Sequence, residues 1–284
     1  MLGIIIVNYN DWDNLRSCIN SIEINIPYKI YVVDNASKPN SYSEELLRNK
    51  NIVFIKSEIN GGYSFGNNLG LSQSVIDGCD LFLISNTDII FNSDSINKLI
   101  KPLQKRECDV VGPKVNLPFG KTQEEILGVR INPLGKIKLI INSASRGTLF
   151  KKYKDLFNNK RNPVNNKLQV YGVSGCCFAF NMKTFDKVMP FDENIFLFNE
   201  EWLLAEKCIR EELKVMVNYN SEVLHLHGST TKLMKLFSYK CFIKSEIYLL
   251  KTVFPRFLVI NMFILILRIP KLIIIYIKDK FYSL

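Results

Sequence analysis

The chain has 284 residues, of which 47% are hydrophobic, so it can bury a core of domain size. Its formal net charge is +10, and most of this excess lies in residues 230–284 beside long apolar runs. A nucleic-acid-binding protein would instead spread positive charge over a folded groove with interleaved aromatic residues. The distribution therefore argues against a nucleic-acid partner and favours an anionic membrane surface.

The cysteines and the N-terminal sequence favour a cytoplasmic protein. The seven cysteines are odd in number, scattered and without C-x-x-C spacing, which is typical of reduced thiols. A strand-like run begins at residue 3, with no basic region, long apolar segment or cleavage site before it, so we expect no secretion signal.

Strands and helices alternate through the first hundred residues. Apolar runs predict strands over 3–7, 29–34, 51–56 and 81–85, and helical spacing predicts helices over 12–22, around 43–47 and over 64–77. This alternation indicates an α/β fold with a mainly parallel sheet flanked by helices. Residues 116–169 are less regular, and the basic, Asn-rich stretch 151–167 is interpreted either as a mobile lid or as a solvated loop.

The last part of the chain, residues 232–284, is a basic and apolar tail. Arg268, Pro270 and Lys271 divide its apolar stretch into pieces shorter than the ~20 residues that a spanning helix needs. We expect helices that lie in the membrane interface. The alternative is a helix that packs on the domain or on a second copy of the chain in a homo-oligomer.

Polar residues follow three of the predicted strands, at the point where each strand ends. The clusters are residues 8–10, 34–37 and 86–88. Ligand sites of parallel sheets lie beyond the carboxyl ends of the strands, so Asp88 is predicted to face a ligand rather than the core. The alternative for a single carboxylate here is a turn or helix cap.

Six stretches, in the same order, make the chain resemble the family-2 inverting glycosyltransferases with the GT-A fold. They are IIIVNYN, IYVVDNAS, NGGYSFGNNLG, LFLISNTDIIF, GVSGCCFAFNMKTFDKVMPFDENIFLFNEEW and VLHLHGST. The similarity is strongest to the rhamnosyltransferase-like branch that builds bacterial surface polysaccharides. It implies a glycosyltransferase domain over 1–231, with a nucleotide-binding half (1–115) and an acceptor-binding half (116–231).

The resemblance implies a divalent cation, Mg²⁺ or Mn²⁺, held against the donor diphosphate. Asp88 matches the last acidic position of the family's metal motif, Asn86 matches the first, and Thr87 stands where proline is common. His225 aligns best with a family histidine that contacts the metal or diphosphate, and His227 shares its face of an extended run. The alternative for both histidines is a satisfied position in the core.

The resemblance also implies the residues that bind the nucleotide and the sugar. Asp34 matches an aspartate that contacts the base or ribose, and its acceptor-only oxygens suit an imide or sugar hydroxyls. Glycines 61, 62 and 66 are expected to let backbone approach the ligand closely. The remaining donor-side candidates are Asn8, Tyr9, Asn10, Asn60, Gly62, Asn67, Asn68 and Gly175.

An inverting transfer needs a general base for the acceptor hydroxyl, and Glu201 aligns with it. Glu200 and Glu201 begin a predicted helix, whose dipole favours ionised carboxylates; ordinary first-turn acidic residues are the alternative. Asp192 and Glu193 lie just before this helix, and Trp202 packs it down on the acceptor side. The chain departs from the family in having Glu for Asp at 201 and Leu203 in place of a second Asp.

Together these features predict transfer of a sugar, rhamnose as the best guess, from a dTDP- or UDP-linked donor. The acceptor would be a polyprenyl-diphosphate-linked glycan, and the enzyme would be peripheral on the cytoplasmic face of the cell membrane. One alternative is a non-catalytic scaffold that binds a nucleotide sugar. A sugar nucleotidyltransferase is disfavoured because no Gly-rich, basic loop follows the first strand.

Overall fold

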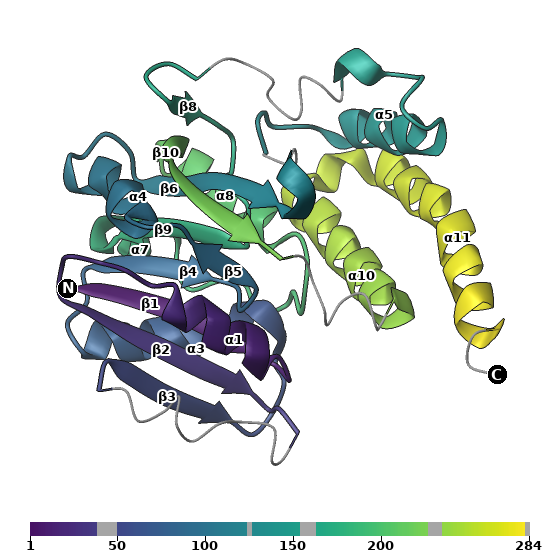
Figure 1. Ribbon diagram of the computed structural model, residues 1–284. Helices are drawn as coiled ribbons and strands as arrows, with labels where there is room; N and C mark the ends of the chain where they lie inside the picture. The colour runs from purple at the N-terminus through teal and green to yellow at the C-terminus, as the bar shows by residue number, and fades with distance from the viewer. Residues whose placement is uncertain (39–49, 124–126, 154–162, 227–234, 282–284) are drawn as a thin grey trace.

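The centre of the molecule is a β-sheet with the strand order β3-β2-β1-β4-β9-β6-β10-β5 (Figure 1). The computed structural model describes residues 1–38, 50–123, 127–153, 163–226 and 235–281. The strands are β1 (Leu2–Asn8), β2 (Tyr28–Asn35), β3 (Ile52–Ser57), β4 (Leu81–Ser85), β5 (Ile89–Phe91), β6 (Val110–Leu117), β9 (Cys177–Asn181) and β10 (Val215–His225). The short strands β7 (Lys121–Thr122) and β8 (Lys167–Gln169) pair with β6 and β10.

The sheet is parallel in its first half and mixed in its second. Strands β3, β2, β1 and β4 are parallel neighbours, and they lie within two residues of the predicted strands. Strand β9 runs antiparallel to both β4 and β6, and β5 runs antiparallel to β10. The prediction of a mainly parallel sheet therefore holds only for the N-terminal half. The helix expected around 43–47 lies outside the described residues.

Alternate side chains of β1 enter two different cores. Ile4 packs in one core with Leu15 of α1 (Trp12–Asn20) and Leu99 of α4 (Ser95–Gln104). Ile5 points to the opposite face and packs in the other core with Leu71 of α3 (Gly62–Ile76), next to α7 (Met182–Val188) and α8 (Glu200–Arg210). Burial on both faces explains why this strand reads as a continuous apolar run.

Helix α3 lies unusually close to the sheet because two of its positions lack a Cβ atom. A Cβ at Gly66 would lie 2.6 Å from Val7, and one at Gly70 would lie 2.6 Å from Ile5. The prediction that Gly66 allows close approach of a ligand is therefore wrong, since Val7 fills that space. The tight packing fixes the N-terminus of α3 beside the carboxyl end of β1.

The segment expected to be irregular contains a helix, α5 (Pro133–Ala144). It begins with Asn132, whose side chain accepts a hydrogen bond from the Gly135 amide at 2.9 Å, and with a proline in its first turn. Both are ordinary features of a helix start. The predicted lid, 151–167, lies partly outside the described residues, so it stays a prediction.

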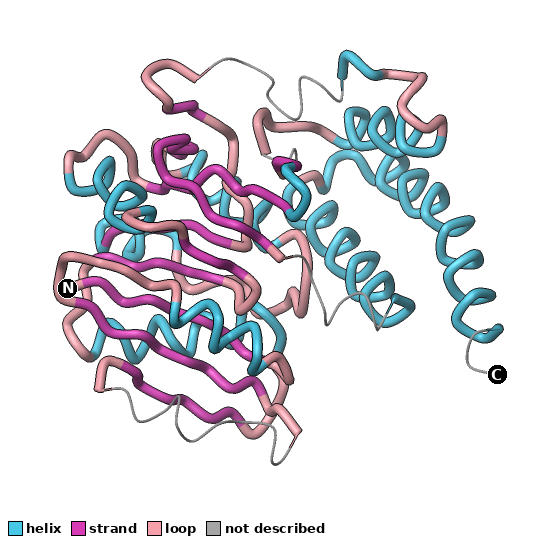
Figure 2. The backbone as a smooth tube through the Cα atoms, in the orientation of Figure 1, coloured by secondary structure: helices cyan, strands magenta, loops and turns pink. Residues whose placement is uncertain are grey.

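The tail forms two long helices, α10 (Lys235–Val253) and α11 (Leu258–Phe281), joined by the 3-10 turn η2 (Pro255–Phe257) (Figure 2). The expectation that Arg268, Pro270 and Lys271 break the apolar stretch is wrong, because Pro270 lies inside a continuous α11. One face of α11 is held by packing around Ile264, which is fully buried. By length and composition alone, the segment Pro255–Lys280 is long and apolar enough to cross a membrane.

A buried charge cluster ties the tail to the rest of the molecule. Arg268 of α11 donates two hydrogen bonds to Glu246 of α10, at 2.8 and 2.9 Å. Lys136 of α5 lies 3.4 Å from the same carboxylate. Burial alone would raise the pKa of Glu246, but the two cations outweigh it and hold that pKa below its ordinary value. The predicted domain boundary at 231 falls outside the described residues and stays a prediction.

Candidate functional site

A cavity of about 450 Å³ lies where the carboxyl ends of β1 and β4 meet the end of β10 and the first turns of α3 and α8. Most of the residues predicted as a site line this cavity. They are Tyr9, Asn60, Gly62, Asn67, Asn86, Thr87, Asp88, Gly175, Glu200, Glu201 and His225. The topology thus brings together residues that lie more than two hundred positions apart in the sequence.

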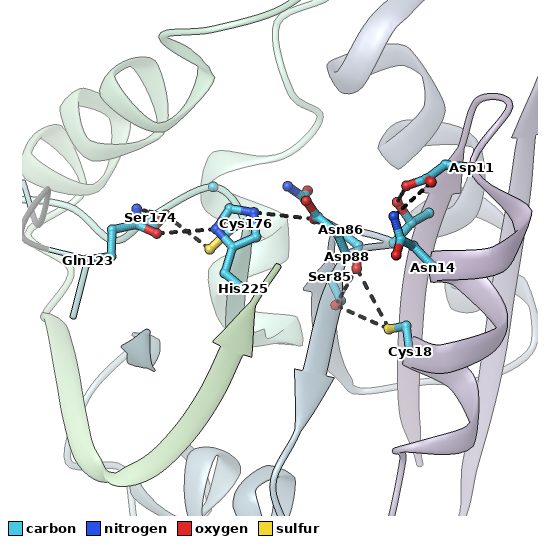
Figure 3. Close-up of polar contacts among 12 residues, drawn as sticks. Asp11, Asn14, Cys18, Ser85, Asn86, Asp88, Gln123, Ser174, Cys176 and His225 are labelled. Carbon is cyan, nitrogen blue, oxygen red and sulfur yellow. Dashed lines mark hydrogen bonds and ion pairs between the residues drawn. The ribbon is translucent and has the colours of Figure 1, made fainter. Parts of the chain in front are cut away.

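Asp88 and His225 form an ion pair in the wall of the cavity (Figure 3). Antiparallel pairing of β5 with β10 places His225 opposite Ile89, next to Asp88. His225 Nε2 lies 3.3 Å from Asp88 Oδ1, and its Nδ1 lies 3.3 Å from Gln123 Oε1. Burial alone would lower the pKa of His225, but Asp88 and Cys176 raise it to about 10. The buried carboxylate is therefore compensated by a charge, as burial requires.

Asp88 and His225 suit a divalent cation that is also bound by phosphate oxygens or water. A carboxylate and an imidazole are both ligands of Mn²⁺, and Mg²⁺ favours carboxylates together with phosphates and water. Within the described residues there is no group of three or more His, Cys, Asp or Glu side chains that could hold a metal by itself. Asp88 and His225 thus fit a cation that would displace the proton from His225 Nε2 and whose remaining positions a diphosphate would fill. His227 lies outside the described residues.

Asp11 and Gln123 line the cavity but were not predicted as site residues. Thr87 Oγ1 donates to Asp11 Oδ2 at 2.7 Å, so Asp11, the N-cap residue of α1, brings a second carboxylate near the end of β4. Asp11 directly follows the predicted 8–10 cluster, and that position was a usable signal. Gln123 follows the short strand β7 and has no comparable sequence signal.

Asn67 lines the cavity and carries a buried, unsatisfied side-chain oxygen. The side chain is 1% exposed, and its Nδ2 donates to the Tyr63 carbonyl at 3.0 Å. Its Oδ1 has no hydrogen-bond donor among the residues that the structure describes. A buried acceptor without a partner costs about 1–3 kcal/mol, so a ligand hydroxyl or N–H group there is favourable.

The Asn60–Gly62 turn is held from inside the protein. Asn35 Nδ2 donates to Asn60 Oδ1 and to the Gly62 carbonyl, both at 3.0 Å. Gly62 has φ +88°, and a Cβ there would lie 2.1 Å from the Phe196 carbonyl oxygen. The segment before α8 passes so close to residue 62 that only glycine fits there. Gly62 also borders the cavity.

Three predicted donor-side residues at the ends of β1 and β2 are absent from the described cavity lining. Asn8 accepts from the Asp11 amide at 3.2 Å, and Asp34 accepts from the Ser37 amide at 3.2 Å. Asn10 is exposed and accepts from the Lys38 amide at 2.8 Å. In this structure these side chains shape the loops that follow the strands, and their predicted contact with the nucleotide stays a prediction.

Asn68, Asp192 and Glu193 also bond within the protein rather than line the cavity described here. Asn68 donates to Glu193 Oε1 at 2.7 Å and pairs with the backbone of Phe191. Asp192 accepts from Tyr248 Oη of α10 at 2.7 Å. These bonds brace the segment that leads into α8, and the predicted contacts of the three residues with donor or acceptor stay predictions.

Glu200 and Glu201 begin α8 after two residues in the left-handed region, Phe198 and Asn199. Asn199 donates to Ser245 of α10 at 2.9 Å, which anchors the helix start. Burial raises the pKa of Glu200, and the neighbouring Glu201 raises it further. Glu200 therefore tends to keep its proton near neutral pH.

Gly175 leaves space directly beside Glu201. A Cβ at this position would lie 3.8 Å from Glu201 Oε2 and 3.7 Å from Tyr63 Oη. Tyr63 Oη donates to the Gly175 carbonyl at 2.6 Å and so holds the turn that precedes β9. A Cβ atom would thus lie in ordinary contact with the carboxylate, so a larger side chain at this position would occupy space beside Glu201.

A second cavity, of about 650 Å³, lies on the other side of Glu201. Glu201, Gln123 and Phe198 line both cavities. Trp202, predicted on the acceptor side, lines the second cavity, and Lys136 Nζ lies 4.5 Å from the centre of its indole ring. Glu201 is therefore accessible from two compartments.

Comparison with known proteins agrees with this arrangement. The sequence profile of the family described as Glycosyl transferase family 2 matches residues 3–189, more than half of the chain. The chain is similar to the low-salt glycan biosynthesis hexosyltransferase Agl10 of Haloferax volcanii, with 26% identity over 218 residues. The match covers 75% of this chain and 63% of that protein, so the chain spans less than two thirds of its relative's length.

Two solved structures share the fold at low sequence identity. GalNAc-T7 with UDP, GalNAc and Mn²⁺ has a TM-score of 0.60 at 14% identity, over 80% of this chain and 44% of that one. S. aureus TarS residues 1–349 in complex with UDP-GlcNAc has a TM-score of 0.55 at 14% identity, over 88% and 66% of the two chains. These likenesses confirm the predicted α/β fold of the GT-A type.

Proposed function

Because this chain belongs to glycosyl transferase family 2, we propose that it transfers a hexosyl unit from a nucleotide-sugar donor to an acceptor hydroxyl, with inversion. The observation that carries this proposal is the position of Glu201 in the wall shared by two cavities. A base between donor and acceptor is what direct displacement needs, since it must face the acceptor hydroxyl while that oxygen attacks the sugar.

The first cavity would hold the donor. Asn67 Oδ1 offers an acceptor to a donor hydroxyl or imide N–H, and Tyr9 and Asn60 border the same space. A Mg²⁺ or Mn²⁺ ion held by Asp88 and His225 would neutralise charge on the departing diphosphate. Gln123 orients the His225 ring through Nδ1, and Thr87 is oriented by Asp11.

Glu201 would take the proton of the acceptor hydroxyl. Glu200 supports this role because its raised pKa means that it adds little negative charge beside the base. Gly175 keeps the space beside the carboxylate free for the reacting groups.

For the finer identity of the substrates, we propose a UDP- or dTDP-linked hexose, with rhamnose as the best single guess from the sequence. The relative in Haloferax volcanii is named a hexosyltransferase of glycan biosynthesis, which supports a hexosyl unit. The acceptor proposed is a polyprenyl-diphosphate-linked glycan of a bacterial surface polysaccharide, such as O-antigen or capsule. The site of action is the cytoplasmic face of the membrane.

Asp88→Asn is expected to remove the Mn²⁺-dependent part of nucleotide binding. In wild type, UDP with Mn²⁺ should raise Tm, because a ligand at about 100 times its Kd adds about 2.7 kcal/mol to the free energy of unfolding. In the variant, the shift on adding Mn²⁺ to UDP should fall to near zero in a thermal-shift assay. Asp186→Asn, an exposed aspartate on α7, is the matched control and should keep the wild-type shift. An unchanged Mn²⁺ shift in Asp88→Asn contradicts the metal role, and the absence of any shift with UDP or dTDP compounds in wild type contradicts the donor.

The exposed apolar side of α11 supports a membrane surface as a partner. Val259, Ile266 and Ile273 are 78%, 55% and 51% exposed. Their combined change to Asn should weaken co-sedimentation with vesicles of phosphatidylglycerol and phosphatidylcholine by about tenfold or more, since each buried aliphatic side chain contributes about 1.5–3 kcal/mol.

The chain offers a matched control for this membrane test. Val164, Ile59 and Ile76 are of the same residue types and 76%, 62% and 76% exposed, but they lie outside the tail. Changing these three to Asn should leave sedimentation unchanged. Equal loss in both triple variants would show that the effect is general hydrophobicity and not a surface on α11.

A further inference from the structure

The second cavity combines an apolar wall with basic groups. Its apolar side includes Leu127, Ile131, Leu139 and Ile140. Three cationic side chains also line it. Lys136 lies on α5, Arg146 follows the C-terminal end of α5, and Arg268 lies on α11. A ligand that matches both features is an anion joined to an apolar chain.

The basic groups are not fully neutralised within the cavity. Lys136 and Arg268 share one carboxylate, that of Glu246, which is itself fully buried. Arg146 is exposed and makes no ion pair with any residue in the described part of the chain. The guanidinium N–H groups of Arg146 can therefore donate two parallel hydrogen bonds to a phosphate group.

Asn142 gives an independent indication of a ligand in this cavity. The side chain is 3% exposed and lines the cavity. Its Oδ1 has no hydrogen-bond donor from the residues that the structure describes. Since an unsatisfied buried oxygen is costly, a hydroxyl group from a bound ligand is the natural partner.

The position of the cavity relative to the tail suggests where the apolar chain would go. Figure 1 shows α5 lying across the upper ends of α10 and α11, on the side of the sheet where the tail is. Arg268 lines the cavity from α11, the same helix whose other side exposes Val259, Ile266 and Ile273. Helix α11 therefore borders both the cavity and the exposed apolar surface.

We propose that the second cavity binds the acceptor through a lipid-linked phosphate, with Arg146 as the phosphate-binding residue. This inference rests on the proposed function, because it places the sugar end of the acceptor toward Glu201. Asn142 Oδ1 then accepts a hydrogen bond from a sugar hydroxyl, and the aliphatic residues of α5 contact the start of the lipid.

The test is a binding titration of the full chain with farnesyl phosphate below its micelle concentration, next to farnesol and inorganic phosphate. Trp202 lines the cavity and is one of only two tryptophans, so the Trp12→Phe background makes its fluorescence a local reporter. Calorimetry on the unmodified chain gives the same affinities should that background be unstable. Farnesyl phosphate should bind with saturation, and farnesol and inorganic phosphate at least about tenfold more weakly, as expected for loss of a charged hydrogen bond.

Arg146→Gln should weaken farnesyl phosphate about tenfold or more. Arg106→Gln is the matched control, because Arg106 is also exposed and has φ 57°, close to the 54° of Arg146. The proposal is overturned if both variants bind alike, if farnesol binds as tightly as its phosphate, or if inorganic phosphate binds as tightly as farnesyl phosphate.

In each variant the UDP–Mn²⁺ thermal shift is measured as well. An intact shift with failed lipid-phosphate binding overturns only this inference, whereas absence of the shift in wild type overturns the proposed function.

Discussion

Glu201→Gln is expected to lower kcat by roughly 10²–10⁴-fold while leaving nucleotide binding intact. Glutamine has nearly the same shape but cannot take a proton, so only the general-base step is lost. The measurement is release of nucleoside diphosphate from the donor that most stabilises wild type, with a lipid extract as acceptor. Thermal shifts with UDP and Mn²⁺ should match wild type, since Asp88 and His225 are unchanged.

The control for this variant is Glu211→Gln, at the C-terminal end of the same helix. Glu211 is exposed and faces Lys187 at 3.3 Å, away from both cavities, so turnover should not change. Wild-type turnover in Glu201→Gln would contradict the base assignment. A wild-type protein that binds nucleotide sugar but never turns it over would support the non-catalytic scaffold instead.

The N-terminal half of the fold follows from local patterns in the sequence. Runs such as residues 3–7 are apolar throughout because β1 is covered on both faces, and the polar residues after them mark the sheet edge. Asp88 could be identified in this way. Its partner His225 could be suspected from its family match alone, because the contact depends on β5 pairing with β10.

Other parts of the site depend on contacts that no local pattern reports. Gln123 reaches His225 from a segment without apolar periodicity, and Asn8 and Asp34 turned out to bond to neighbouring loops. Helix α5 is not predicted although Asn132 and Pro133 are start signals, because residues 116–169 as a whole are less regular than the rest of the domain. Without α5 the second cavity could not be anticipated.

The ion pairs of the tail could not be predicted from local sequence patterns either. From the sequence, Glu246 is one of two acidic residues that reduce a basic tail's net charge. In the structure it lies between Lys136, 110 positions away, and Arg268, 22 positions away. This cluster depends on how α5, α10 and α11 pack together, and the amino-acid composition does not predict that packing.

Glu246→Gln is expected to lower the free energy of unfolding by about 3–5 kcal/mol at pH 7. The change leaves the buried Lys136 and the Arg268 guanidinium without their shared counter-charge, and an uncompensated buried charge is costly. The measurement is urea unfolding of the full chain at several pH values. Because folding lowers the pKa of Glu246, its stabilising charge is present above the ordinary glutamate pKa and is lost as pH falls through the folded value. The difference between wild type and variant should therefore be constant near neutral pH and shrink below about pH 4.5.

Two further variants distinguish the stability lost by breaking a buried ion pair from the stability lost by removing any carboxylate. Glu222 pairs with Lys114 at 3.0 Å, but its side chain is 39% exposed, so Glu222→Gln should cost no more than about 1 kcal/mol. The triple change Lys136→Met, Glu246→Leu and Arg268→Met removes every charge of the cluster and should recover most of the stability lost in Glu246→Gln. If Glu246→Gln costs no more than Glu222→Gln, the cluster does not hold α11 in place. The basic lining of the second cavity would then lose the fixed position of Arg268 on which its shape depends.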